Sequence, residues 1–160
     1  MPSWSRADAL LAITSLLGVD ALIPTRLTAH EEISQPFSFE VEAVSQIGAV
    51  EPDTLLNQAL CVILQASGKP VRYFHGVVQG LRSLGKTRGE TAAEFFAYRL
   101  TLAPRLWFLN QTTDCRIFQK KSTSDILKKM FQEAGMSDFE LRVTGSLSPR
   151  EYTIQSTRAI

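Results

Sequence analysis

The chain has 160 residues, enough for one ordinary domain or for one domain and part of a second. Hydrophobic residues make up 44% and charged residues 21%, the balance of a globular chain that buries a core. The formal net charge of +1 provides no global field to attract nucleic acid or an acidic membrane. The two cysteines, Cys61 and Cys115, form no CxxC pair, which argues against a disulfide scaffold or a cysteine metal site; we expect both in the core.

The segment from Ala7 to Leu17 could pass for the apolar part of a secretory signal, because Arg6 precedes it. Asp8 and Thr14 interrupt that run and no small-residue cleavage site follows, so the segment is predicted to be the first strand. No apolar run approaches the roughly 18–20 residues of a membrane span. We therefore expect a protein that is cytoplasmic when made and that does not insert stably into a membrane.

The clearest strand lies between Phe37 and Ala43, where apolar and polar residues alternate with a period of two. Arg26 to Glu31 alternates in the same way, so the two segments are predicted to form a hairpin across Glu32 to Gln35. The odd-numbered residues of the second strand, Phe37 and Phe39 among them, are expected in the core.

Two further strands are predicted after this hairpin. Leu60 to Leu64 is a short apolar run, typical of a fully buried strand. Val71 to Leu84 is a long strand that contains Gly76 and Gly80. Glycines inside a strand indicate bulges or sharp bends, as where a sheet curls into a barrel.

Glu94 to Leu102 is predicted as the returning strand, with Tyr98 and Leu100 on its apolar face. Pro104 ends this strand. The stretch from Arg105 to Phe118 is aromatic and shows no clear period.

One helix is predicted near residues 122–134. Ser122 can cap it, with Asp125 three residues later in the arrangement of a capping box. Apolar residues follow at helical spacing, and Gly135 can adopt the left-handed conformation that ends a helix. A last strand is predicted from Phe139 to Val143.

About seven strands and one helix predict a mainly β fold, an antiparallel β-barrel with some α structure. Residues 1–104 are expected to form the barrel domain. Residues 105–155 are expected to form a junction and the start of a second domain that the chain does not finish. Apolar residues of that unit, such as Met130 and Phe131, would then lack partners, so we expect self-association.

The sequence offers little for catalysis. His30 begins a stretch that resembles a zinc-protease helix motif, but Ser34 stands where the second histidine would be. His75 has no nucleophile or carboxylate motif near it. Nucleophile-elbow, phosphate-loop and dinucleotide-binding motifs are absent. We therefore expect no catalytic residue, no metal, no cofactor and no enzymatic activity.

Binding of single-stranded nucleic acid is an alternative that the composition leaves open. A barrel with aromatic and cationic residues has the ingredients of a stacking platform. The near-neutral net charge argues against it, because phosphate neutralisation supplies most non-specific affinity. The residues concerned are Arg72, Tyr73, Phe74, Arg99, Arg105, Trp107, Lys120 and Lys121.

Five motifs, taken in order, resemble the N-terminal region of VgrG-type spike proteins of type VI secretion systems. Any one of them is a weak signal, whereas five in this order are specific. They are SQPFSFE at 34–40, RYFHGVV at 72–78, YRLTLAPRLWFL at 98–109, DCRIFQ at 114–119 and DIL at 125–127.

This resemblance implies a fold of the phage tail-hub type and a structural role. Barrel domains of a homotrimer would form a ring that joins the secretion tube to the puncturing needle. The implied partners are the tube protein and effectors or adaptors, without nucleic acid. Full-length relatives are exported by the type VI machine without a signal peptide.

Three residues are expected at the junction between the two domains. Asp114, Arg116 and Phe118 are placed there, and Arg116 could satisfy a carboxylate or backbone carbonyls. Trp107, beside Phe108, is expected either to plug one end of the barrel or to pack on another subunit.

The resemblance ends near Gln155, and residues 156–160 are an atypical tail. Family members run to several hundred residues, so a truncated or frameshifted gene, or a cut fragment, is expected. Two other functions remain open: a baseplate hub protein of a contractile phage or tailocin, and an oligonucleotide- or saccharide-binding β-barrel module.

Overall fold

A computed structural model describes residues 9–18, 20–45, 48–67, 69–88, 94–111 and 113–155, so the tail at 156–160 lies outside the described residues. The chain divides into two compact units, residues 1–104 and 105–160, and each is described by itself. Among the described residues, none of the helices combines the length and the apolar character needed to cross a membrane.

The first unit is built on one six-stranded antiparallel sheet. Its strand order is β1-β4-β5-β6-β3-β2, so β1 and β2 lie at the edges. The strands are β1 (Leu11–Thr14), β2 (Ile23–His30), β3 (Ser38–Ser45), β4 (Ala59–Ala66), β5 (Lys69–Arg88) and β6 (Glu94–Ala103). The predicted hairpin is present as β2 and β3, which pair from Ile23·Val44 to His30·Ser38.

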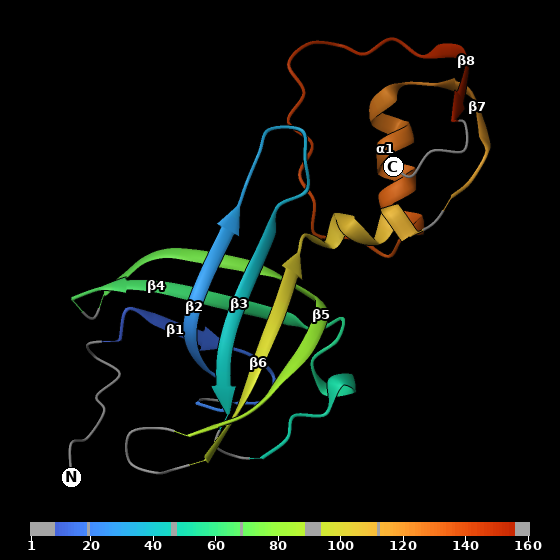
Figure 1. The fold of residues 1–160 in the computed structure, drawn as a ribbon. Coiled ribbons are helices and arrows are strands. Elements are labelled where there is room, and N and C mark those ends of the chain that lie inside the picture. The colour runs from blue at the N-terminus through green and yellow to red at the C-terminus, as the bar shows by residue number, and fades with distance from the viewer. Residues whose placement is uncertain are drawn as a thin grey trace. The chain divides into compact units, whose positions relative to one another are not determined.

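The sheet curls because β5 bends along its length. In Figure 1, β2, β3 and β6 run nearly upright, β1 and β4 cross behind them, and β5 belongs to both groups. The ladder between β5 and β6 shifts its register between Val78 and Gly80 and again between Ser83 and Gly85. Such irregularities bend a strand and increase its twist. The predicted barrel is therefore observed as a half-barrel, within a fold that is mainly β and antiparallel as predicted.

The inner face of the curled sheet carries the core of the first unit. Val41, Val62 and Leu100 have no exposed surface, and Phe39 and Tyr98 are 3% exposed. On β3 the residues alternate between buried and half-buried, as the period of two predicts. Partly buried hydrophobic residues pack against the edge of this core, among them Ile13 of β1 and Leu27 of β2.

The second unit combines a two-stranded antiparallel sheet with one helix. The sheet pairs β7 (Arg116–Lys121) with β8 (Arg150–Gln155), and α1 spans Thr123–Glu133. The capping box is present: the Asp125 N–H donates to the Ser122 hydroxyl at 3.2 Å, and the Ser122 N–H donates to the Asp125 carboxylate at 3.3 Å. Gly135 has a φ of +69°, the left-handed conformation predicted for the end of this helix.

The strand predicted at Phe139 to Val143 is wrong, because that segment contains neither helix nor strand. A strand requires a partner ladder, and β7 pairs with β8 at Arg150–Gln155 instead. Phe139 packs edge-on against Phe131 of α1, with the ring centroids 4.8 Å apart. The stretch without a clear period also contains regular structure, a 3-10 helix at Arg105–Gln111 and the start of β7.

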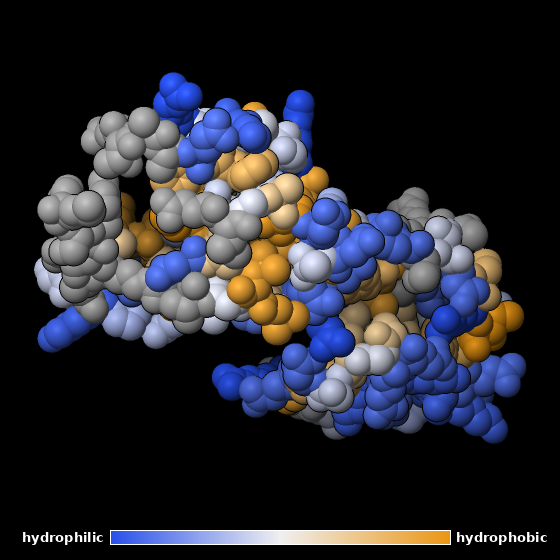
Figure 2. All heavy atoms as spheres, turned by 90° about the horizontal axis from the view of Figure 1, so that it is seen from below, coloured by the Kyte–Doolittle hydropathy of each residue, from blue (hydrophilic) through white to orange (hydrophobic). Residues whose placement is uncertain are grey.

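Two expectations about single residues also need correction. Cys115 is exposed and Cys61 is half-buried, so neither is a fully buried core residue. Met130 is 8% exposed and thus has partners within its own unit. Figure 2 nevertheless shows hydrophobic side chains, in orange, at the largely hydrophilic surface. The large exposed ones include Ile33, Val71, Tyr73, Ile117 and Ile154.

Candidate functional site

Of the site residues predicted in the first unit, Phe39, Tyr98 and Leu100 are buried in its core, and Phe37 is partly buried and packs against that core. The rings of Phe37 and Phe39 stack with centroids 4.4 Å apart, and Phe39 meets Phe74 of β5 edge-on at 5.3 Å. The Val50 N–H donates a 2.7 Å hydrogen bond to the hydroxyl oxygen of Tyr98. Tyr98 therefore fills the core with its ring and fixes the loop after β3 with its polar end.

Gly76 lets these elements approach one another. A Cβ atom on Gly76 would lie 3.0 Å from the carbonyl oxygen of Ala103, 3.1 Å from the Cβ of Leu102 and 3.4 Å from the ring of Phe37. The ladder between β4 and β5 is regular at this residue. Gly76 is thus a point of close backbone approach, whereas the predicted irregularity is found at Gly80.

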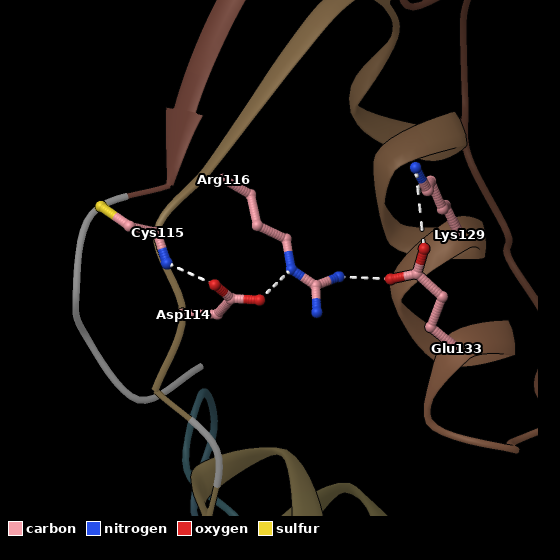
Figure 3. A network of polar contacts seen from close by, with 5 residues as sticks. All are labelled: Asp114, Cys115, Arg116, Lys129 and Glu133. Carbon is pink, nitrogen blue, oxygen red and sulfur yellow. Dashed lines mark hydrogen bonds and ion pairs between the residues drawn. The ribbon is translucent and has the colours of Figure 1, made fainter.

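In the second unit, Arg116 connects two carboxylates from different segments (Figure 3). Its Nε donates to Oδ2 of Asp114 at 2.6 Å, and its Nη1 donates to Oε2 of Glu133 on α1. Asp114 Oδ1 also accepts the Cys115 N–H at 2.8 Å, and Lys129 Nζ lies 3.6 Å from Glu133 Oε1. These contacts, which we call the Arg116 network, tie the start of β7 to the end of α1.

The charges in the network satisfy one another. The hydrogen bond from Arg116, and after it the one from the Cys115 N–H, lowers the pKa of Asp114. The same bond, together with that to Glu133, raises the pKa of Arg116. Asp114 is therefore ionised near neutral pH, and Arg116 engages both it and Glu133.

A cavity of about 410 Å³ lies beside the Arg116 network. Its apolar wall includes Phe108, Leu109 and Met130, and its polar wall includes Arg116 and Gln155. The side-chain oxygen of Gln155 is buried and has no hydrogen-bond partner within the described part of the chain. The cavity is thus an imperfectly packed junction between the sheet, the helix and the 3-10 segment.

The structure brings Asp114 and Arg116 into contact. The other two residues predicted in this part of the chain, Phe118 and Trp107, lie outside the Arg116 network. Phe118 is 5% exposed and points from β7 to the interior of the second unit. Trp107 is half-buried and packs edge-on against Phe108, with the ring centroids 5.5 Å apart. The sequence did not single out Glu133, although its spacing of four residues from Lys129 marks an exposed ion pair on a helix.

The histidines and cysteines form no catalytic arrangement in the described part of the molecule. His30 pairs with Glu32 at 2.9 Å on an exposed hairpin. His75 lies opposite Cys61 in the ladder between β4 and β5, but burial raises the pKa of the Cys61 thiol. A thiol with a raised pKa is a poor nucleophile. Among the described residues, no group of three histidine, cysteine, aspartate or glutamate side chains could hold a metal ion.

Comparison with known proteins places most of the chain within one family. The profile of the phage tail baseplate hub (GPD) family matches residues 30–157. The type VI secretion system spike protein VgrG1c of Pseudomonas aeruginosa is 38% identical over 152 residues, which are 95% of this chain and 20% of that protein. VgrG1b of the same organism is 35% identical over 146 residues, 91% of this chain and 19% of that protein.

A solved structure shares the fold. It is that of the E. coli c3393 protein, described as a component of the type VI secretion system with structural similarity to the T4 bacteriophage tail proteins gp27 and gp5. The TM-score is 0.73 at 19% identity, over 92% of this chain and 39% of that one. The chain spans about a fifth of the length of the VgrG relatives above.

Proposed function

The chain belongs to the phage tail baseplate hub (GPD) family, and from this membership we propose that it is a structural component of the base of a type VI secretion spike. The observation that carries the proposal is the match to the hub family over residues 30–157, together with 38% identity to a type VI spike protein over 95% of this chain. The curled antiparallel sheet, shared with a structure at a TM-score of 0.73, agrees with it.

In this proposal residues 1–104 form the first hub domain, and residues 105–155 form the junction and part of a second. Phe37, Phe39, Tyr98 and Leu100 hold the first domain together, and Trp107, Asp114, Arg116 and Phe118 contribute packing and ion pairing within residues 105–155. The charged groups of the Arg116 network form ion pairs with one another, which supports a mechanical and not a catalytic role. The protein works as a homotrimer that joins tube to needle and carries effectors or adaptors, and it is made in the cytoplasm.

A second function, in the baseplate of a contractile phage or tailocin, is favoured by the name of the matching family. The two functions differ in the tube to which the hub binds. The type VI function predicts binding to the type VI tube protein of the same genome, whereas the phage function predicts binding to a phage tail-tube protein.

Sedimentation velocity tests the proposal directly. We expect the purified chain to sediment as a trimer, either by itself or once the type VI tube protein is added. We also expect the chain and the tube protein to sediment together as a complex. A monomer that binds neither the type VI tube protein nor the phage tail-tube protein would contradict the hub function. Binding of single-stranded oligonucleotide at low salt would instead support the alternative of a nucleic-acid-binding module.

A further inference from the structure

One face of the two-stranded sheet β7–β8 is apolar and open. Ile117 of β7 lies directly opposite Ile154 of β8, and Tyr152 lies two residues before Ile154. Residues two apart on a strand share a face, so these three side chains lie together. They are 63%, 54% and 58% exposed, while Phe118, which alternates with Ile117, is 5% exposed on the other face. We call this set, Ile117, Tyr152 and Ile154, the β7–β8 face.

Two cations lie at the other end of the same ladder. Lys121 is directly opposite Arg150, and within the described residues neither forms an ion pair. Like charges opposite one another in a ladder destabilise it. Four carboxylates of this unit pair with other arginines: Asp114 and Glu133 with Arg116, Asp138 with Arg105, and Glu140 with Arg142. Asp125, which caps α1, interacts electrostatically with Lys121, and Glu151 is exposed and follows Arg150 in the sequence.

We propose that the β7–β8 face binds an acidic and apolar segment of another protein. Apolar side chains of the segment cover Ile117, Tyr152 and Ile154, and its carboxylates lie between Lys121 and Arg150. This charge complementarity identifies the occupant, because carboxylates both pair with the two cations and relieve their mutual repulsion. The interaction stands apart from the proposed place of the chain in the spike.

The geometry of the ladder defines the spacing that the segment needs. Ile117 and Lys121 are four residues apart on β7. An extended partner therefore presents its apolar and acidic side chains about four residues apart. The two isoleucines supply aliphatic surface that the apolar side chains of a polypeptide can cover, and Tyr152 supplies the one aromatic ring of the face, so a polypeptide fits this face better than a nucleic acid does.

The probe is a short fluorescein-labelled peptide with leucines and glutamates at this spacing, titrated with the full chain while fluorescence anisotropy is recorded. A peptide with lysine in place of each glutamate and a single-stranded oligothymidine are the comparison ligands. We expect saturable binding of the acidic peptide, weakened by added salt, and much weaker binding of both comparison ligands.

Substitutions in and outside the β7–β8 face test whether the peptide binds there. Arg150→Glu and Ile154→Ser should each weaken binding roughly tenfold or more, by charge reversal and by loss of apolar contact respectively. Arg142→Glu reverses an exposed charge outside the face and should leave the affinity unchanged. Thermal melting confirms that each variant is folded, and Lys121→Glu replaces Arg150→Glu if the latter is not.

Three results would overturn the proposal. They are a lack of binding of the acidic peptide, equal binding of the lysine peptide or the oligothymidine, and an affinity that the folded face variants leave unchanged.

Discussion

Gly76 is the residue at which the curled sheet tolerates added volume least. We expect Gly76→Ala to lower the free energy of unfolding by about 1–3 kcal/mol, because its Cβ would meet the backbone oxygen of Ala103 at 3.0 Å. Gly80→Ala is the matched control, since the nearest atoms to its Cβ are those of Thr101 at 4.0 Å. Urea denaturation of both variants measures the difference. Equal stability of the two would show that the strands are not tightly apposed at Gly76.

Asp114 should make the stability of the second unit depend on pH in the acid range. Its pKa is lower in the folded chain than its ordinary value, chiefly through Arg116. A carboxyl of this kind stabilises the fold above its unfolded pKa, and its contribution is lost as the pH falls through the lower, folded value. The melting temperature should therefore fall as the pH drops below about 4.

Asp114→Asn should have a lower melting temperature than the wild type at pH 7, and the two should converge toward pH 3. Glu151→Gln, which removes an exposed carboxylate outside the network, is the control and should follow the wild type. A constant gap between Asp114→Asn and the wild type across this range would mean that the charge of Asp114 does not stabilise the fold.

At the scale of elements, α1 depends on its first turn. Ser122→Ala removes the hydroxyl that accepts the Asp125 N–H, and we expect a loss of about 1 kcal/mol in stability. Thr123→Ala, at the exposed first residue of the helix, leaves the capping box intact and should have little effect. Guanidinium denaturation followed by circular dichroism distinguishes the two. If both variants unfold at the same denaturant concentration, the cap does not hold the helix.

The sequence predicted those elements that local chemistry specifies. The capping pair Ser122 and Asp125 indicated where the helix starts, and the alternation from Phe37 to Ala43 indicated which side of β3 is buried. Phe139 to Val143 shows the same alternation but is not a strand, because pairing depends on a distant partner that no local pattern reveals. The contact of Arg116 with Glu133 joins residues 17 apart and was likewise invisible, although a carboxylate partner was one of the two expected.

At the scale of the whole molecule, several side chains within the family motifs contribute to packing and to internal ion pairs. Phe39, Tyr98 and Leu100 are buried, and Arg116 is held between two carboxylates. On the outer face of the first unit, Arg99 pairs with Glu42 at 2.8 Å across β6 and β3. This arrangement agrees with the proposed role of the chain as a structural component of a hub.

The most direct test replaces the matching N-terminal region of VgrG1c in Pseudomonas aeruginosa with this chain, since the two are 38% identical over 152 residues. The measurement is the type VI-dependent release of the hybrid spike protein into the medium. The hub function predicts release close to that of the parent, and loss of release when Leu100→Asp breaks the core of the curled sheet. A hybrid that accumulates in folded form inside the cell and is not released would contradict it.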